Sequence, residues 1–478
     1  MIQYGISKVI VALLCSSLLC IIAVLLALDN AQPDVFQYVY ILPLVFSLLS
    51  FAFIMATPSD YYKNVGVVIV SLQFVIRCAI TPLFMYFGDY RSHFAINSSK
   101  DICSAVFLML YEALWCFAAV HIGMRKKNAK RSALQKKQIS SHKLGIILGL
   151  LTAICVLLWV LIPAVRDSYR SFSEMMLSKT KDNPYDYREI VTSGSLARIG
   201  ATLFTFLFSF LRYLVPAYII INLYKRKKSM ASFIISLGLV ALQFLFVPKA
   251  VAAALFAACI FLILIIDLYP ERRKITSILA GIVAFGASIL TFSLTYIKAS
   301  SWYGVENIWQ YLSRLLNGYF TGVSNVASIF WMPDRNKFEI LLNSLIGALP
   351  FRNTIFPSAL EKDTVYTLFT SLPGMGAQIV STIGCGQYLF GGLFSPTFSF
   401  IFVYAAVRFG RKYQATQNYW KKIAYLYMSV ISALGVGMYN MPITLINWVQ
   451  VGIPMLMIAH FAGKDNVKGS EDYLQSGI

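Results

Sequence analysis

The sequence has few charged residues for its length, and acidic residues are the scarcest. Only 13% of its 478 residues are charged, with 21 Asp and Glu against 41 Lys and Arg, whereas 58% are hydrophobic. The mean hydropathy is +0.67. A soluble domain carries about twice this charged fraction. The shortage of charge therefore excludes an ordinary soluble globular protein and indicates an integral membrane protein.

The sequence also lacks the motifs of several common chemistries. Its eight cysteines and four histidines are scattered, without the spacing of a metal site or a disulfide framework. No GxxxxGK[ST], HExxH or dinucleotide-binding motif occurs. We therefore expect no metal ion and no cofactor, and a chemistry that uses neither ATP nor zinc.

Long apolar runs fill most of the chain, and a helix needs about 20 apolar residues to cross the hydrocarbon core. Twelve such runs predict an all-α polytopic membrane protein with about 12 transmembrane helices, forming one integral membrane domain over 1–478. The first run is too long for a removable signal peptide. The predicted spans are 7–28, 35–56, 64–87, 102–123, 144–165, 199–223, 229–247, 250–268, 276–297, 388–409, 421–439 and 442–461.

Basic residues gather in alternate loops and explain the net charge of +20. The clusters at 124–137, 224–229, 271–274 and 408–413 all fall on one side when twelve spans are threaded. Positive loops stay in the cytoplasm, so both termini are predicted to be cytoplasmic. Topology and contact with anionic membrane lipid account for these clusters, and we exclude nucleic acid as a partner.

The threading leaves two long segments on the periplasmic side, 166–198 and 298–387. Loops of this length tend to be functional. In the second segment, apolar residues between Val305 and Val326 recur at helical spacing. The opposite face of this predicted helix carries Gln310, Arg314, Asn317 and Thr321. Such an amphipathic helix lies on the membrane surface or presents its polar face to a ligand, and the sequence leaves both alternatives open.

The second segment ends in the most glycine-rich stretch of the chain, SLPGMGAQIVSTIGCGQYLFGG (371–392). Irregular backbone at membrane depth is tolerated where protein or a water-filled cavity satisfies its polar groups. The glycines therefore predict a re-entrant or broken helix that lines a cavity open to the outer side. Small residues that let helices pack tightly are the alternative.

Several charged residues lie within or beside predicted spans, although an Arg or Lys at a helix centre costs about 2.5 to 3.5 kcal/mol on insertion scales. Arg77 and Glu112 lie near the middles of the third and fourth spans, and we expect them to form a structural ion pair. Arg212 has no obvious acidic partner in the neighbouring spans. Lys249 lies at the predicted outer turn between spans seven and eight.

Together with Arg198 and Arg314, these two residues form a set of cations in the outer half of the protein. Such cations suit an anionic lipid-linked substrate that carries its own leaving group. A polyprenyl-diphosphate sugar is such a substrate, because fixed cations stabilise the charge released when its sugar–phosphate bond breaks. An acceptor hydroxyl also needs a base, and the outer carboxylates available are Asp186, Glu189, Asp334 and Glu339.

Two local motifs accompany this layout: RLLNG at 314–318, which has the Arg-x-x-x-Gly form, and TSLPGMGAQIVSTIGCGQYLFGGLFSP at 370–396. With the twelve spans and two outer loops, they make the chain similar to bacterial O-antigen polymerases of the Wzy type. The resemblance implies a GT-C-like inner-membrane glycosyltransferase. At the periplasmic face, it would transfer a growing glycan from undecaprenyl diphosphate to a new undecaprenyl-diphosphate-linked repeat unit. A chain-length regulator protein is a further candidate partner.

The resemblance also implies site residues. Arginines of the two outer loops matter in the family, which here corresponds to Arg198 and Arg314 as catalytic residues. We add Glu339 as a candidate base. Lys249 stands where many relatives have a Gly-Arg pair and keeps the positive charge. The residues expected to bind diphosphate and glycan are Lys249, Arg212, Arg352, Gln310, Asn317 and Gly318.

The main alternative function is a lipid-linked oligosaccharide flippase, which would share the span count and the basic cavity. Transporters usually show internal repeats and short connections, and neither is evident in this sequence. An ion-coupled transporter would need acids within the spans, where Glu112 is almost the only one. Related ligases use an outer-loop histidine, and none occurs between Lys298 and Gly386.

Overall fold

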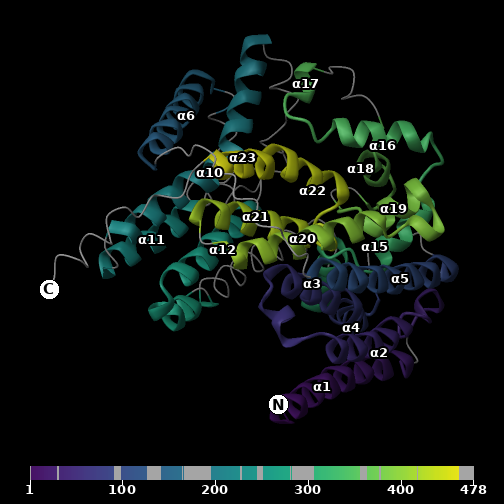
Figure 1. Cartoon of the computed structure of the whole chain (residues 1–478). Coiled ribbons are helices and arrows are strands. Elements are labelled where there is room, and N and C mark those ends of the chain that lie inside the picture. The colour runs from purple at the N-terminus through teal and green to yellow at the C-terminus, as the bar shows by residue number, and fades with distance from the viewer. Residues whose placement is uncertain are drawn as a thin grey trace. The chain divides into compact units, whose positions relative to one another are not determined.

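The computed structural model describes residues 2–29, 32–90, 98–125, 141–163, 165, 195–226, 229–244, 251–279, 281–282, 306–355, 363–375, 378–416 and 418–461. Within these residues every regular element is a helix (Figure 1), so the predicted all-α fold class is confirmed. Several predictions lie outside the described residues. They concern 126–137, most of the loop 166–198, Asp186, Glu189, Lys249 and most of the ninth predicted span.

Eight of the described helices are long and apolar enough to cross a membrane, and each lies at a predicted span. They are Lys8–Ala27, Asp34–Ala56, Val65–Phe87, Ser99–Met124, Lys143–Leu161, Ala197–Arg226, Gly392–Ala415 and Met441–Phe461. Three more predicted spans contain shorter helices: Met230–Ala241, Phe256–Leu268 and Tyr419–Leu434. The multi-pass membrane character is therefore confirmed, and the number twelve stays a prediction.

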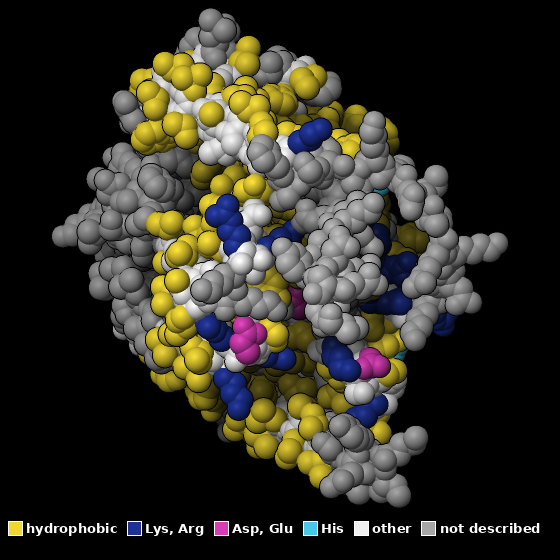
Figure 2. Space-filling model, turned by 60° about the vertical axis from the view of Figure 1, so that its left-hand side comes forward, with side chains coloured by type: hydrophobic (Ala, Val, Ile, Leu, Met, Phe, Trp, Pro, Cys, Tyr) yellow, Lys and Arg dark blue, Asp and Glu magenta, His cyan; other side chains and the backbone are white. Residues whose placement is uncertain are grey.

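The outer surfaces of these helices are apolar. On α1 (Ile2–Ala27), for example, Leu14, Leu18 and Ile21 are exposed. Figure 2 shows hydrophobic side chains over much of the face that it draws, with Lys and Arg side chains between them. Exposed large apolar areas of this kind mark contact with another apolar phase, which for helices of this length is the lipid hydrocarbon.

The described helices form two compact units. Unit 1 comprises Met1–Lys127, Leu290–Gln414 and Met428–Trp448, and unit 2 comprises Asn128–Ile289, Ala415–Tyr427 and Val449–Ile478. The chain therefore enters each unit more than once, and α21 (Tyr419–Leu434) contributes residues to both.

In unit 1, pairs of packed helices form the core. α1 packs on α2 (Ile41–Ala56), α2 on α5 (Ser99–Met124), and α4 (Thr81–Phe87) on α14 (Ile308–Tyr319). The other elements of this unit are η1 (Asp34–Phe36), η2 (Ser59–Lys63), α3 (Val65–Val75), η3 (Ile76–Ile80), α15 (Val323–Ala327), η6 (Ser328–Trp331), α16 (Lys337–Ile346), α17 (Arg352–Ile355), α18 (Val365–Thr370), α19 (Thr382–Phe390), η8 (Gly392–Phe394), α20 (Thr397–Ala415) and α22 (Met441–Asn447).

The helix predicted from Val305 to Val326 is broken in the structure. α14 ends at Tyr319, and α15 begins only at Val323. Between them Thr321 adopts a left-handed conformation with φ of 49°. A β-branched residue seldom adopts this conformation, and the apolar spacing on which the prediction rested carries no sign of it.

The glycine-rich stretch contains a broken helix, as predicted. α19 ends at Phe390, and Gly391 then takes a positive φ of 71° before η8 and α20 begin. Gly386 allows tight helix packing, the second alternative drawn from the sequence. A Cβ added there would lie 1.9 Å from the backbone O of Ser395. Tight packing is therefore seen at Gly386 and a helix break at Gly391, and the cavity open to the outer side stays a prediction.

Unit 2 is arranged around the long helix α10 (Ser195–Arg226). This helix packs against α6 (Ser141–Leu161), α11 (Met230–Ala241), α12 (Val251–Leu268) and α23 (Ile453–Phe461). The remaining elements are η4 (Leu242–Phe244), η5 (Pro270–Arg272), the first part of α21 and most of η9 (Trp448–Gly452). Because α10 begins at Ser195, Arg198 lies in its first turns rather than in the preceding loop.

Candidate functional site

The polar face of α14 is turned into unit 1. Gln310 is 4% exposed, and Ser313 and Asn317 are fully buried. Ile308 and Trp309, on the apolar face, are 42% and 44% exposed. This is the reverse of an amphipathic helix on a soluble core. The polar stripe therefore packs inside unit 1, and the two alternatives, a helix on the membrane surface and a helix that presents its polar face to a ligand, both stay predictions.

Local hydrogen bonds explain how α14 begins and how its polar face is held. The Asn307 side chain caps the helix by accepting hydrogen bonds from the backbone N of Trp309 at 3.0 Å and of Gln310 at 2.9 Å. Asn317 Nδ2 donates to the backbone O of Ser313 at 3.0 Å. Among the described residues, Asn317 Oδ1 and Ser313 Oγ are buried without a hydrogen-bond partner. This face therefore offers polar atoms to a water molecule or a polar ligand.

The two local motifs noted in the sequence contact each other. A Cβ added at Gly318, the last residue of RLLNG, would lie 2.2 Å from Oε1 of Gln378 in the glycine-rich stretch. Nearby, Asn325 Nδ2 donates to the backbone O of Ile379 at 2.8 Å. A Cβ at position 318 would therefore displace the end of the Gln378 side chain, which packs here against α14.

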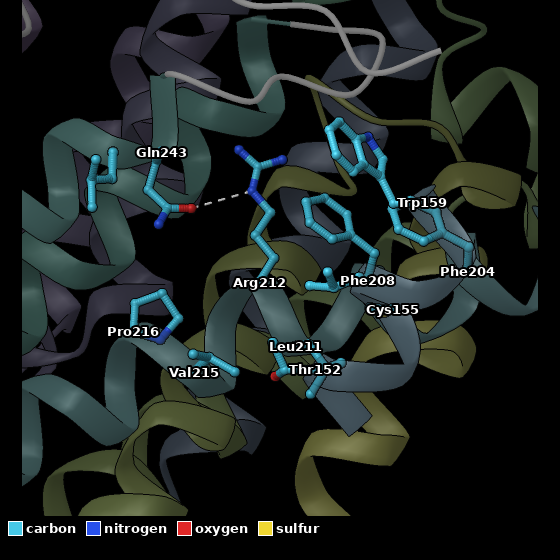
Figure 3. A pocket seen from close by; sticks show the side chains of 12 residues that line it. Thr152, Cys155, Trp159, Phe204, Phe208, Leu211, Arg212, Val215, Pro216 and Gln243 are labelled. Carbon is cyan, nitrogen blue, oxygen red and sulfur yellow. Dashed lines mark hydrogen bonds between the residues drawn. The ribbon is translucent and has the colours of Figure 1, made fainter. Parts of the chain in front are cut away.

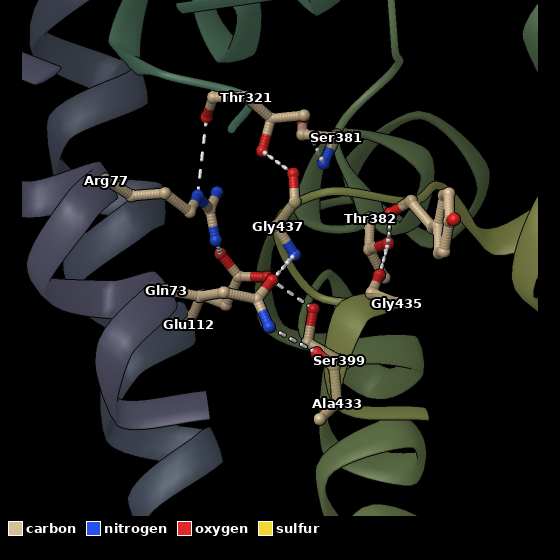
Figure 4. Close-up of polar contacts among 12 residues, drawn as sticks. Gln73, Arg77, Glu112, Thr321, Ser381, Thr382, Ser399, Ala433, Gly435 and Gly437 are labelled. Carbon is tan, nitrogen blue, oxygen red and sulfur yellow. Dashed lines mark hydrogen bonds and ion pairs between the residues drawn. The ribbon is translucent and has the colours of Figure 1, made fainter. Parts of the chain in front are cut away.

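A buried ion pair lies beside Thr321, two residues beyond the end of α14 (Figure 4). Arg77 Nη1 and Glu112 Oε2 are 2.8 Å apart, and both side chains are almost fully buried. Arg77 Nε donates to the backbone O of Thr321 at 3.4 Å, and the Ser399 hydroxyl donates to Glu112. The predicted pairing of Arg77 with Glu112 is confirmed. Arg77 lies in η3, a π-helical turn of the kind that is frequent at functional sites.

Further hydrogen bonds extend this network to the turn between α21 and α22. Gln73 Nε2 donates to the backbone O of Ala433 at 2.8 Å, and the backbone N of Gly437 donates to Gln73 Oε1 at 2.9 Å. Thr321 Oγ1 donates to the backbone O of Gly437 at 3.2 Å. Thr321 is thus held from two sides, which stabilises its left-handed backbone and the end of α14.

The other predicted site residues of unit 1 lie on separate elements. Arg314 is half-buried on α14. Glu339 is exposed in the first turn of α16, where the helix dipole favours a carboxylate. Arg352 Nη1 donates to the backbone O of Gly347, which closes α16, at 3.1 Å. Glu339 therefore stabilises the start of α16 through the helix dipole, and Arg352 stabilises its end by a hydrogen bond.

Unit 2 contains a cavity of about 440 Å³ between α6, α10 and η4. Its walls are almost entirely apolar and include the aromatic rings of Trp159, Phe204 and Phe208. Figure 3 shows the Arg212 guanidinium pointing into the cavity, between Gln243 on one side and the rings of Trp159 and Phe208 on the other. The cavity combines one cation with a large apolar surface.

Arg212 is 9% exposed and lies near the middle of α10. Its Nε donates to Gln243 Oε1 at 3.3 Å. One turn further along, Pro216 also lines the cavity and has no N–H to donate to the Arg212 carbonyl. An arginine at this depth is expensive to insert, so its location in a cavity marks it as a functional candidate.

Two of the predicted cations, Arg198 and Arg212, lie far apart on one helix. Arg198 precedes Arg212 by 14 residues on the same helix, which separates them by roughly 21 Å along the axis at 1.5 Å per residue. One diphosphate cannot contact both side chains from a single position. Gln243 and Trp159 were missed by sequence reasoning. Gln243 could have been found from the sequence, because it is a polar residue within the apolar run LGLVALQFLFV.

Comparison of the chain with protein-family models, with curated proteins and with solved structures finds no match. The sites described above are the Arg212 cavity of unit 2 and the buried polar face of α14 in unit 1. The function is inferred from the chemistry of these side chains.

Proposed function

We propose that the chain is a membrane glycosyltransferase that polymerises undecaprenyl-diphosphate-linked oligosaccharide repeat units into O-antigen or a related surface polysaccharide. The observation that carries the proposal is the Arg212 cavity, in which a buried cation lies among aromatic and aliphatic walls. A polyprenyl diphosphate needs both features, because its phosphates require a cation and its hydrocarbon chain requires an apolar surface.

Arg212 would bind the diphosphate of the donor. A charge-assisted hydrogen bond contributes about 1.5 to 3 kcal/mol, and the guanidinium can make two parallel ones to phosphate oxygens. Gln243 Oε1, at 3.3 Å from Arg212 Nε, orients the guanidinium plane. The same interaction strengthens as negative charge develops on the leaving diphosphate, which lowers the barrier to transfer.

The proposed reaction transfers the growing glycan to a hydroxyl at the non-reducing end of a new repeat unit. The acceptor oxygen forms a bond to the anomeric carbon of the donor glycan while the bond from that carbon to the diphosphate oxygen breaks. Undecaprenyl diphosphate leaves with the electron pair, and the hydroxyl proton passes to a base. Of the four carboxylates named from the sequence as candidate bases, Glu339 and Asp334 are described, and both belong to unit 1.

The polar face of α14 would contact the glycan. Gln310 and Asn317 each carry an amide that both donates and accepts hydrogen bonds, as sugar hydroxyls do. Arg314 lies on the same helix between them. The proposal includes the topology inferred from charge: both termini in the cytoplasm and the active site facing the periplasm, in the bacterial inner membrane. A chain-length regulator protein is the expected protein partner.

A lipid-linked oligosaccharide flippase is the second candidate, and one observation favours it. The helical path is broken at Gly391, and the spans Val65–Phe87 and Met441–Phe461 contain the π-helical turns η3 and η9. Discontinuous helices near the middle of a membrane are common in transporters, where they line the substrate pathway. The two candidates differ in whether repeat units are joined or only moved.

The pattern of lipopolysaccharide on a gel tests the proposal. Deletion of the gene should leave the single capped repeat unit and remove the ladder of longer chains, whereas loss of a flippase removes both. Complementation with Arg212→Ala should fail to restore the ladder at equal protein level. The control is Arg226→Ala, which also removes one arginine charge from α10, but at its exposed end. This variant should restore the ladder. A normal ladder from Arg212→Ala would overturn the role given to the cavity.

A further inference from the structure

The helix α16, in the predicted periplasmic segment 298–387, turns an apolar face outward. Phe338 is 74% exposed, and Leu342 and Leu345 are exposed as well. At about 100° per residue, these three side chains form one stripe roughly 60° wide along the helix. Asn343 and Ser344, on the opposite side, are almost fully buried. Water would favour the reverse arrangement, so an apolar phase is expected to cover the stripe.

The inward side of α16 fixes this orientation. Asn343 Nδ2 donates to the backbone O of Asp363 at 3.1 Å, and the backbone N of Val365 donates to Ser344 Oγ at 3.4 Å. Both contacts hold α16 to the start of α18, and Ile340 packs beside them in the core of unit 1. Turning the apolar stripe inward would break both hydrogen bonds and leave their polar groups without partners.

α16 packs on elements that begin membrane spans. Figure 1 shows it beside α18 and α19, and it also contacts α22, which begins the span Met441–Phe461. α19 ends with the exposed Phe390, and the span Gly392–Ala415 follows it. In the first turn of that span, Leu393 and Phe394 are exposed too. Exposed apolar side chains therefore continue from a span into the elements that support α16.

The segment that enters α16 carries an exposed tryptophan. Trp331 Nε1 donates to Asp101 Oδ2 at 3.1 Å, in the first turn of the span Ser99–Met124. The Tyr388 hydroxyl donates to the backbone O of Pro333 at 2.9 Å, which ties the same segment to α19. A tryptophan with a paired N–H and an exposed ring is typical of the boundary between membrane and water. The entry to α16 therefore lies at the end of a third span.

Charged side chains precede or border the apolar stripe without an excess of either sign. They are Asp334, Arg335, Lys337 and Glu339, all exposed. Lys337 Nζ and Asp334 Oδ1 are 3.6 Å apart. Charged side chains at the border of an apolar stripe reach toward water, as they do in helices that lie in a membrane surface. Because these charges balance, they do not favour an anionic headgroup, and the apolar stripe dominates the contact.

We infer that α16 is embedded in one leaflet of the membrane, where Phe338, Leu342 and Leu345 contact the acyl chains of membrane lipid. In the proposed topology this is the periplasmic leaflet. The segment 298–387 then contains a helix that lies in the membrane surface as well as residues in the aqueous phase. This lipid contact does not depend on the proposed glycosyltransferase activity.

Photo-crosslinking of the purified full-length protein in lipid nanodiscs tests the inference. The photoreactive amino acid benzoylphenylalanine replaces either Phe338 or Leu342, and irradiation joins it to C–H bonds within its reach. Both side chains are exposed, so the replacement leaves the packing of α16 intact. Mass spectrometry of the intact protein should find adducts with the mass of one phospholipid at both positions. The yield should be the same in phosphatidylcholine nanodiscs and in nanodiscs that contain phosphatidylglycerol.

Lys337 is the matched control position, because it is exposed on the same helix but lies about 100° around the axis from Phe338. Benzoylphenylalanine at Lys337 should give several-fold less lipid adduct. Absence of lipid adduct at Phe338 and Leu342, or a yield no higher than at Lys337, would overturn the inference. A crosslink between two copies of the chain in place of lipid would also overturn it, since the stripe would then be a protein interface.

Discussion

Two buried arginines show how neighbours decide the role of a charged residue. Arg77 lies 2.8 Å from the Glu112 carboxylate, which neutralises it. Arg212 Nε donates to the side-chain amide oxygen of Gln243 in the wall of the unit 2 cavity. The first pair could be predicted from the sequence, because an acid and a base occur at similar depths in consecutive spans. The second contact could not, because it depends on how η4 packs against α10.

The Arg77–Glu112 pair makes a prediction about stability. Arg77→Ala leaves a buried carboxylate without its cation and should destabilise the protein by about 3 to 5 kcal/mol. The double variant Arg77→Met, Glu112→Leu removes both charges and should be considerably more stable than the single variant. The melting temperature of each variant in detergent, followed by size-exclusion chromatography after heating, compares their stabilities. Equal melting temperatures for the two variants would contradict a structural role of the pair.

Arg314 and Arg198 make a prediction about activity. If they act on the substrate, Arg314→Ala and Arg198→Ala should shrink or abolish the lipopolysaccharide ladder while protein levels hold, because each loses a charge that stabilises a phosphate or a polar glycan. Densitometry of the ladder against an immunoblot of the same cells provides the measurement. Unchanged banding in either variant would remove that arginine from the site.

At the scale of the helix, the sequence predicts the features that depend on hydropathy, such as the membrane spans. It misses those that depend on local backbone conformation, such as a turn within a predicted helix. The length of the apolar runs predicted the eight long spans, because a helix must be apolar over about 20 residues to cross the bilayer. The helical spacing of apolar residues predicted one helix from Val305 to Val326, although the chain turns at Thr321. It also gave no sign that α14 buries its polar face, because periodicity reports two faces without saying which one points inward.

The close approach at Gly386 gives a prediction about α19. Gly386→Ala should destabilise the protein by about 1 to 3 kcal/mol or more, because the added Cβ meets backbone that cannot rotate away. Gly392 has nothing within 4 Å of an added Cβ, so Gly392→Ala is the matched control and should change little. Melting temperatures of the purified variants compare them, and equal values would contradict the tight packing of α19 against Ser395.

The contact between Gly318 and Gln378 predicts a rescue. Gly318→Ala should lower activity modestly, because the Cβ displaces the end of the Gln378 side chain from its place beside α14. Gln378→Ala removes the obstacle, so the double variant should recover ladder length relative to Gly318→Ala. A double variant as impaired as Gly318→Ala would show that the glycine acts in another way.

At the scale of the whole molecule, the membrane threading determines which chemistry is available. The predicted periplasmic segment 298–387 carries α14, α16 and the start of the glycine-rich stretch, and the proposed function requires all of them outside the cytoplasm. Phosphatase fusions placed after Asn336 and after Thr364 should be active, whereas fusions after Lys412 should be inactive. Cytosolic location of the first two would contradict the proposed orientation of the active site.

Reconstitution of the purified protein tests joining of repeat units most directly. Proteoliposomes supplied with undecaprenyl-diphosphate-linked repeat units, without ATP or metal ions, should yield glycans of two and more repeats together with released undecaprenyl diphosphate. The Arg212→Ala protein should yield much less under the same conditions. Substrate that crosses the bilayer without any gain in length would contradict the polymerase and identify a transporter.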